Sequence, residues 1–368
     1  MACMNGSLTK TSITTFKHKG VIVMETKEIL KNKIDFAVIV SVARANPNGD
    51  PLSGNRPRID YEGYGEISDV CIKRKIRNRL MQTGHSIFVQ SDDNRVDEYR
   101  SLRERAKEEL KDVYKNLFKK EKKKKGEDEK QDNKKEAGKG DEIFRAAACG
   151  KWLDVRAFGQ VFAFGKESGK AESKEDDNDS APEVSDDSGK PEKGSGVSIG
   201  IRGPVSIHPA FSICKVNDRA ESQQIIKSVN LEKPGPEKAS DTMGMKHRIN
   251  HGVYVFYGSI NPQLAALPRG TGFNDEDAKA IKEALRTLFV NDESSARPAG
   301  TMEVHKLYWW EQKQDAKQYS SAKVHRTVRD KVKALKDEPK SISDYYIPSK
   351  AEIEKELPGM SVEIIEGE

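Results

Sequence analysis

The sequence predicts an α+β fold in which apolar strands alternate with amphipathic helices. Strand-like runs occupy 33–45 (KIDFAVIVSVARA) and 251–260 (HGVYVFYGSI). Apolar residues at helical spacing lie in 69–80 and again in 274–290. With 368 residues, the chain is long enough for one large domain or two ordinary ones.

The expected elements follow the order strand, helix, strands, helix, strand, which is the order of a ferredoxin-like or RNA-recognition-type sheet. The first helix has an apolar stripe formed by Ile72, Ile76 and Leu80. The second has acidic residues in its first turn, where they suit the helix dipole. After the first strand at 33–45, we expect strands in 151–164, 196–213, 251–260 and 300–310.

Two strongly charged segments interrupt this order. Residues 111–125 carry eight lysines and two acids, and residues 171–187 carry eight acids and one lysine. Both continue into Gly-, Ser- and Lys-rich sequence with few apolar residues, so we expect flexible surface insertions over about 111–145 and 166–195. The lysine run is then either simply solvated or extends a basic surface.

The composition narrows the class of protein. The formal charge of +5 permits an anionic partner. The four cysteines are far apart and the seven histidines form no HExxH motif, so we expect neither a disulfide framework nor a metal site. The chain also shows no signal-peptide core and no apolar run long enough to span a bilayer. These features predict a soluble protein of a reducing compartment, with no membrane contact.

The segment 46–58, NPNGDPLSGNRPR, predicts a binding loop directly after the first strand. Its glycines, such as Gly54, let backbone amides approach a ligand, and its three prolines stiffen the path and oppose strand pairing. Arg56 and Arg58 provide forked donors that match phosphate oxygens. The GxxxxGK pattern of mononucleotide sites is absent. We therefore expect a cradle for the backbone of a polyanion.

The helix that follows this loop has cations beside its apolar stripe. Lys73 and Arg77 flank the stripe and Arg74 lies just beyond them, whereas Lys75 falls on the other flank. These cations are either the solvated side of a surface helix or a ridge that continues the loop.

Two more arginines lie near glycines in the β-rich segments. RAFGQVF (156–162) matches part of the aromatic RNP1 pattern, with Arg156 at its start and Phe158 as a core residue. SIGIRGPVSI places Arg202 between two glycines. There the guanidinium and the backbone can meet a phosphate together, or the arginine is an ordinary turn residue.

Residues 240–252, SDTMGMKHRINHG, predict a finger that projects from the sheet. Met243 and Met245 share one face of an extended segment and are followed by Lys246 and His247. Apolar tips with basic sides suit insertion between bases together with contact to phosphates. Packing of the methionines in the core is the alternative.

The aspartates near the first loop are the candidates for catalysis. Asp50, Asp60 and Asp69 could bind Mg²⁺ for phosphodiester cleavage. Aspartates in such positions are more often turn formers or helix caps, and Asp69 stands where a cap of the first helix is expected.

Seven motifs in a fixed order resemble one protein family. They are NPNGDPLSGNRPRID, SDVCIKRKIRNRL, WLDVRAFGQVFAF, SIGIRGPVSI, SDTMGMKHR, YVFYGSINPQLA and SSARPAGTMEVHKLYWWE. Together they resemble the backbone subunit of the type I-C CRISPR Cascade, a guide-RNA-binding protein of the RAMP superfamily. The likeness covers about 33–312 outside the charged insertions. It leaves 1–32 as an N-terminal extension and 313–368 as a C-terminal segment.

The resemblance implies a palm of the RNA-recognition or ferredoxin-like type, a fingers insertion and a β-hairpin thumb at about 220–250. It also implies a non-catalytic, cofactor-free subunit for antiviral defence that polymerises as a helical filament along the CRISPR guide RNA. The implied partners are further copies of the chain, the target DNA strand, the guide-processing and large subunits, and a recruited helicase-nuclease, all in a prokaryotic cytoplasm. The residues it places at the RNA are Asn46, Asn48, Gly54, Asn55, Arg56, Arg58, Lys73, Arg74 and Arg77 in the palm, and Met243, Met245 and Lys246 in the thumb.

Two other functions stay open at this point. A metal-dependent endoribonuclease, as in related RAMP subunits of type III complexes, would cut target RNA with Asp50. A general single-strand RNA chaperone would bind as a monomer without a fixed footprint.

Overall fold

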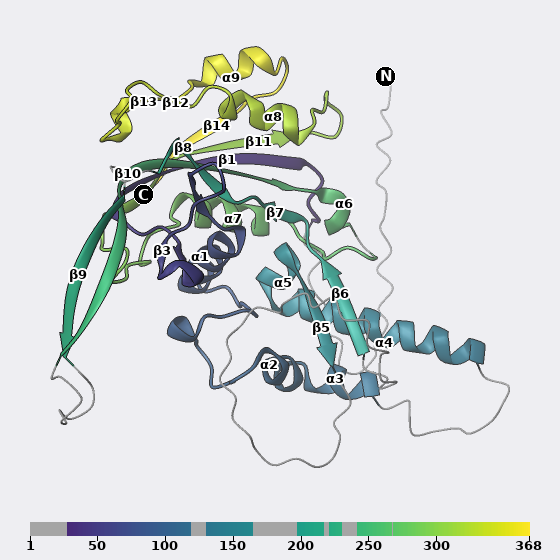
Figure 1. Ribbon diagram of the computed structural model, residues 1–368. Coiled ribbons are helices and arrows are strands. Elements are labelled where there is room, and N and C mark those ends of the chain that lie inside the picture. The colour runs from purple at the N-terminus through teal and green to yellow at the C-terminus, as the bar shows by residue number, and fades with distance from the viewer. Residues whose placement is uncertain (1–27, 119–129, 165–196, 217–220, 230–240, 267) are drawn as a thin grey trace, which may run out of the picture.

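The computed structural model describes residues 28–118, 130–164, 197–216, 221–229, 241–266 and 268–368. Its centre is an eight-stranded sheet with the order β14-β11-β1-β10-β8-β4, and β7 and β9 also pair with β10. Figure 1 shows this sheet with helices on both faces. Within the described residues, every strand pair of the sheet is antiparallel. The class is therefore α+β, as predicted.

The strands of the central sheet are β1 (Lys33–Ala45), β4 (Tyr64–Ile67), β7 (Val205–Ile207), β8 (Ala210–Lys215), β9 (Glu221–Val229), β10 (Asp241–Ile260), β11 (Met302–Gln312) and β14 (Glu363–Glu366). The helices that cover it are α1 (Asp69–Gln82) and α7 (Asp275–Arg286) on one face, with α8 (Ser321–Arg329) and α9 (Lys350–Glu356) on the other. The shorter elements are β2 (Gly49–Asp50), η1 (Pro51–Ser53), β3 (Arg56–Pro57), η2 (Asp92–Asn94), α6 (Pro262–Ala265), β12 (Lys333–Ala334), η4 (Ile342–Asp344) and β13 (Tyr345–Tyr346).

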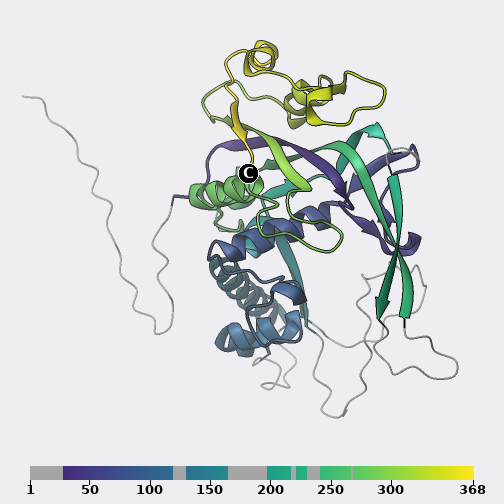
Figure 2. The same cartoon turned by 90° about the vertical axis from the view of Figure 1, so that its left-hand side faces the viewer.

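Strand β1 is buried on both faces, which explains its continuous apolar sequence. Phe36 and Val38 point into the core beneath α1 and α7, whereas Ala37 and Ile39 point into the core beneath α8 and α9. Successive side chains of a strand face opposite ways, so one strand contributes to two cores. Residues 313–362 form the second layer, which lies over the sheet on the side away from α1 (Figure 2).

A separate lobe lies below α1 in Figure 1 and has its own aromatic core. It consists of α2 (Leu102–Glu109), α3 (Lys111–Phe118), α4 (Lys130–Lys151), α5 (Leu153–Phe158) and the two-stranded sheet of β5 (Gly159–Phe164) and β6 (Val197–Arg202). The rings of Phe88, Phe144, Trp152 and Phe162 pack together inside it, with centroids 4.6–5.1 Å apart.

This lobe corrects two expectations. The segment 151–164 was expected to be β-rich, but its first half is helical, and Gly159 with φ +80° marks the change from α5 to β5. The expected flexible insertion at 111–145 contains α3 and much of α4, because Tyr114 and Phe144 supply buried apolar contacts. Residues 119–129, the acidic insertion at 166–195 and residues 1–27 lie outside the described residues.

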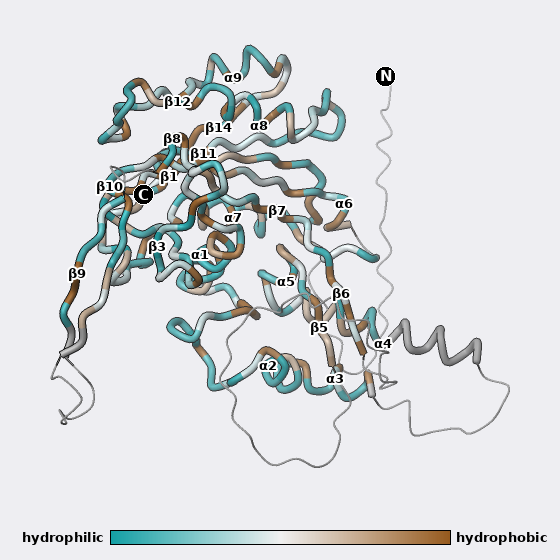
Figure 3. Tube along the Cα trace, in the orientation of Figure 1, coloured by the Kyte–Doolittle hydropathy of each residue, from teal (hydrophilic) through white to brown (hydrophobic). Residues whose placement is uncertain are grey.

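The predicted strand at 251–260 is the second half of a longer strand. Strand β10 begins at Asp241, and its first half pairs with β9 from Asp241↔Val229 to Ile249↔Glu221. This β9–β10 ribbon extends beyond the sheet (Figure 1), and Figure 3 shows hydrophobic residues along it. Residues 230–240 lie outside the described residues. Within the described part of the chain, no helix combines the length and apolar character needed to cross a bilayer.

Candidate nucleic-acid interface

Loop 46–58 folds as a short two-stranded turn at the end of β1. Strands β2 and β3 pair through Gly49↔Pro57 and Asp50↔Arg56. The expectation that the prolines would oppose strand pairing was therefore wrong. A proline has no backbone N–H but can still accept a hydrogen bond through its carbonyl. The loop is closed by a hydrogen bond from the Arg58 amide to the Asn48 carbonyl, at 2.9 Å. The turn passes through the left-handed region at two successive residues, Gly54 (φ 62°) and Asn55 (φ 58°).

The asparagines of the loop hold its shape. Asn46 donates from Nδ2 to the Asn55 carbonyl at 2.6 Å. The Oδ1 atom of Asn48 accepts from both the amide and the hydroxyl of Ser68 at 2.9 Å. Ser68 is the N-cap of α1, and its hydroxyl accepts from the Cys71 amide. The cap is thus Ser68 rather than Asp69, and Asn48 joins the loop to the start of α1.

The three α1 cations that were considered as a ridge, Lys73, Arg74 and Arg77, do not form one. Lys73 pairs with Asp69 one turn earlier, and Arg74 reaches Asp93 at 3.3 Å with 58% of its side chain exposed. The Arg77 side chain instead turns toward the lobe, where Asp154 accepts from its Nε at 3.0 Å.

Lys75 also differs from expectation. Its side chain is buried and paired with Asp292, and burial lowers its pKa. Of the cations at 73–77, Lys73 and Arg74 are therefore the ones that face outward.

The two arginines of the loop have different surroundings. Arg56 makes a bidentate ion pair with Glu221, the first residue of β9, with Nε and Nη2 at 3.1 and 2.9 Å from the carboxylate oxygens. The same carboxylate lies 3.0 Å from Nδ1 of His247 on β10. Arg58 is half-buried, and among the described residues its guanidinium has neither an ion pair nor a hydrogen bond. Arg58 is therefore the loop cation whose donors are available to a ligand.

The arginines near the β5–β6 sheet also divide into one that is paired and one that is exposed. Arg156 donates from Nε and Nη2 to the two oxygens of Asp277, both at 2.7 Å, and Asp277 is the acidic residue in the capping box of α7. This ion pair joins the lobe to the helix layer of the sheet. Arg202 is exposed at the end of β6, next to Gly203.

The β9–β10 ribbon carries exposed apolar side chains. Met243 and Met245 are 77% and 62% exposed, and Ile225 lies directly opposite Met245. They share a face, because paired residues of an antiparallel ribbon project to the same side. Lys246 projects to the other side, where its Nζ donates to the Ser295 carbonyl at 3.3 Å. The predicted finger is therefore a β-ribbon with exposed methionines.

The aspartates near the loop hold turns in place. Asp50 accepts from the Leu52 amide at 3.1 Å, and Asp60 accepts from the Glu62 and Tyr64 amides at 2.9 and 2.8 Å. The described residues contain no group of three or more His, Cys, Asp or Glu side chains with the spacing of a metal site. Burial raises the pKa of the Cys71 thiol, and that of the Cys149 thiol to about 11, so neither is an activated thiolate.

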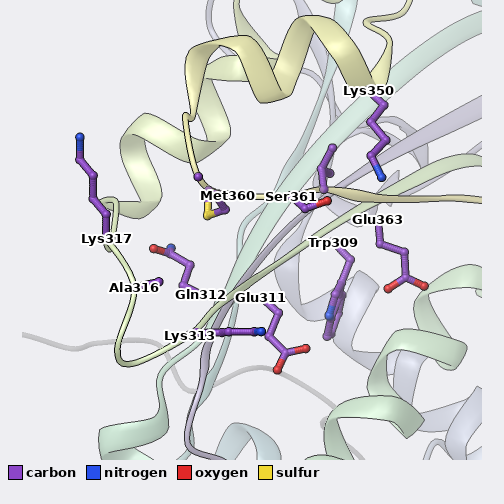
Figure 4. Close-up of a pocket in the computed structure, with 12 residues that line it drawn as sticks. Trp309, Glu311, Gln312, Lys313, Ala316, Lys317, Lys350, Met360, Ser361 and Glu363 are labelled. Atoms are coloured by element: carbon purple, nitrogen blue, oxygen red, sulfur yellow. The ribbon is translucent and has the colours of Figure 1, made fainter.

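A groove of about 430 Å³ lies on the C-terminal side, between the end of β11 and residues 359–363 (Figure 4). Its lining mixes lysines with the carboxylates of Glu311 and Glu363. Figure 4 shows Lys313 beside Glu311, whereas Lys317 points away. This balance of charge does not favour a polyanion, and the groove shares no residue with the loop or the ribbon.

Sequence reasoning missed Glu221 and Ser68. A capping serine before an apolar helix is a known signal and was readable from the SDVCIKRKI motif. No local pattern marks Glu221, because its partner Arg56 is 165 residues away.

The fold and these side chains define a mixed α/β protein with an antiparallel sheet, a projecting ribbon and outward-facing cations on a loop and a helix. A family model described as "CRISPR-associated protein Cas7" matches residues 32–350, which is most of the chain. The chain therefore belongs to the Cas7 family.

The individual relatives share between 14% and 26% of their residues with this chain. A CRISPR-associated protein Cas7 from Haloferax volcanii is 26% identical over 270 residues, which is 73% of this chain and 67% of that protein. A chain of a structure titled "CRISPR RNA-guided surveillance complex, pre-nicking" is 15% identical with a TM-score of 0.39, and the match covers 79% of this chain and 81% of that one. A chain of a second structure, titled "CRISPR RNA-guided surveillance complex", is 14% identical with a TM-score of 0.32 and coverages of 76% and 68%.

Proposed function

We propose that this chain is a guide-RNA-binding backbone subunit of a type I-C CRISPR surveillance complex. Copies would polymerise along the guide RNA and display its bases for pairing with target DNA. Membership of the Cas7 family supports this proposal, and the observation that carries it is the set of outward cations on the loop and α1. Contacts of this kind meet phosphates, so they hold any guide sequence and leave specificity to base pairing.

The parts of the fold take defined roles in this proposal. The palm is the arrangement β1-α1-β8-β10-α7-β11, which has ferredoxin-like connectivity with both helices on one face of the sheet. The lobe of α2–α5 with β5 and β6 is the fingers, and the β9–β10 ribbon is the thumb. Arg58, Lys73, Arg74 and Arg202 contact the RNA backbone, and the ribbon methionines contact bases.

The proposed role needs no catalysis or cofactor from this chain. Asp50 is engaged with the Leu52 amide as the cap of η1, which supports a turn-forming role rather than a metal-binding one. A recruited helicase-nuclease would cleave the target, and the guide-processing and large subunits would complete the complex in the cytoplasm of a prokaryote, away from membranes.

Salt-dependent binding to guides of unrelated sequence tests the proposal. We expect equal affinity for such guides and a steep loss of affinity with salt, with a slope that falls by about 0.7 for each phosphate contact removed. Arg58→Ala and Arg74→Ala should each lower the slope, whereas Lys355→Ala on α9, at the opposite face of the sheet, should not. Affinity that depends on spacer sequence, or slopes that respond equally to all three changes, would contradict the proposal.

A further inference from the structure

Loop 46–58 and the β9–β10 ribbon meet at one carboxylate. Glu221 accepts both forks of the Arg56 guanidinium and lies 3.0 Å from His247 Nδ1. The side chains of Glu221 and His247 are 14% and 8% exposed, whereas that of Arg56 is 54% exposed. A single residue at the root of the ribbon therefore joins the loop, β9 and β10.

A second contact holds the root of the ribbon from its other side. Lys246 donates to the Ser295 carbonyl at 3.3 Å, and the adjacent Ala296 carbonyl accepts from the Asn46 amide at 2.9 Å. The segment after α7 thus contacts both the ribbon and the start of the loop. Beyond these contacts the ribbon is a pair of strands away from the sheet, and an isolated pair has little stability of its own. Its direction must be set at the root.

The charges indicate what the Arg56 cluster does. Glu221 neutralises Arg56 and uses both arms of its fork, so a phosphate would have to displace the carboxylate and overcome its repulsion. Arg58 has no carboxylate partner among the described residues, so its donors can meet a phosphate directly. Arg56 therefore has a structural role, whereas the Arg58 guanidinium is available to a ligand.

We propose that Glu221 is a positioning residue that fixes the direction of the ribbon relative to loop 46–58, through Arg56 and His247. The proposal rests on the proposed function: when copies assemble on RNA, a fixed direction makes every copy present Met243 and Met245 to the strand at the same interval. Arg56 and His247 then act on RNA through the position of the ribbon rather than by contact. A copy without Glu221 binds RNA but contacts it at variable places.

Four variants test this assignment by ribonuclease footprinting on a long guide and by affinity for an RNA that holds one copy. They are Glu221→Ala, Arg56→Glu, the exchange of the two charges (Arg56→Glu with Glu221→Arg), and the control Glu62→Ala. Glu62 is an exposed acid near the same loop, and its carboxylate has no ion pair among the described residues.

We expect Glu221→Ala to reduce the contrast of the periodic footprint by about threefold or more, while the single-copy affinity stays within about twofold. The charge exchange should restore at least half of the contrast that Arg56→Glu loses, and Glu62→Ala should match the wild type. An unchanged footprint in Glu221→Ala, or an exchange no better than Arg56→Glu alone, overturns the positioning role. A loss of affinity in parallel with the footprint would mean direct contact instead.

A measurement without RNA separates this inference from the proposed function. Spin labels at Lys227→Cys on the ribbon and Glu303→Cys on β11, in a chain whose four native cysteines are replaced, report the direction of the ribbon. We expect one narrow distance distribution in the parent and a broad one with Glu221→Ala. If the chain binds no RNA, the proposed function fails while these distances still decide the role of Glu221. Equal distributions overturn that role alone.

Discussion

The Arg77 guanidinium on α1 and the Asp154 carboxylate on α5 form an ion pair, with Nε 3.0 Å from Oδ2. Their side chains are 14% and 1% exposed, and the same carboxylate accepts from the Phe88 and Val89 amides at 2.7 and 3.0 Å. The Arg77 guanidinium also lies 5.2 Å from the centre of the Phe158 ring. A cation that the sequence places among RNA ligands therefore joins the lobe to the helix layer.

Replacing Arg77 should consequently reduce stability before it affects any ligand. We expect Arg77→Ala to lower the free energy of unfolding by about 2–3 kcal/mol, because it leaves a buried carboxylate without its counter-charge. Lys73→Ala removes only a partly exposed pair within α1 and should cost at most about 0.5 kcal/mol. Urea unfolding of the two variants makes the comparison. A stable Arg77→Ala that loses RNA binding would return Arg77 to the interface.

The same pair determines how the α1 cations should be tested. Arg77→Glu would place a second carboxylate against Asp154, so loss of filament assembly in that variant would report misfolding. Lys73→Glu with Arg74→Glu keeps the Arg77 contact and reverses the charge of the outward residues. Because its new carboxylates face only the partly exposed Asp69 and Asp93, we expect this double variant to lose at most about 1 kcal/mol of unfolding free energy. We expect it to lose assembly on RNA in a sedimentation assay. Normal assembly would remove Lys73 and Arg74 from the interface.

Gly200 in β6 and Gly203 just after it should respond differently to substitution by alanine. A Cβ at Gly203 would lie 2.2 Å from the Ala157 carbonyl oxygen and 2.5 Å from the Gly159 nitrogen, both backbone atoms that cannot turn aside. A Cβ at Gly200 would meet nothing within 4 Å. We expect Gly203→Ala to cost at least about 2 kcal/mol and Gly200→Ala to stay within about 0.5 kcal/mol. Thermal unfolding of both variants checks this, and equal midpoints would contradict the tight packing of the β5–β6 corner.

The parts of the fold that the sequence predicted well are those whose apolar period belongs to one element. Strand β1 matches the predicted 33–45 because nine successive residues, 34–42, are buried between two cores. The first helix matches because Ile72, Ile76 and Leu80 repeat along one face. Helix α4 was hidden by its lysines and glycines, although its buried residues Phe144 and Ala148 keep a four-residue spacing with Trp152, which is buried just after the helix ends.

The candidate site was harder to predict than the fold. The sequence alone does not distinguish the roles of four arginines, since each is a cation near a turn or on a helix flank: Arg56, Arg58, Arg77 and Arg156. Their roles differ because three of them meet carboxylates that are distant in sequence, at Glu221, Asp154 and Asp277. Only the folded chain brings these acids into place.

Stability should fall in mild acid, partly through His325. Burial between α8 and the sheet lowers the pKa of this histidine, and the charged or titratable groups around it are Asp35, Lys33, His208 and Tyr257. Since the folded pKa lies below the unfolded value of 6.5, the unfolded chain binds more protons as pH falls through that value, and folding is disfavoured. His325→Gln should weaken the loss of stability between pH 7 and pH 5, as measured by urea unfolding at each pH. An unchanged pH dependence would exclude His325 as a contributor.

The exposed methionines of the ribbon should affect RNA without affecting the fold. Met243 and Met245 are mostly solvent-exposed, so replacing both with alanine should change the free energy of unfolding by no more than about 0.5 kcal/mol. Val161→Ala on β5 is a matched control, because that side chain is 63% exposed and lies in the lobe. If the methionines insert between bases, guide bases at regular intervals are unstacked and react with chemical probes, and the double variant should lose this periodic reactivity. The overall affinity should fall only a few-fold, because it comes from phosphate contacts. The control should leave the probing pattern intact. A pattern that persists in the double variant would show that the ribbon does not separate bases.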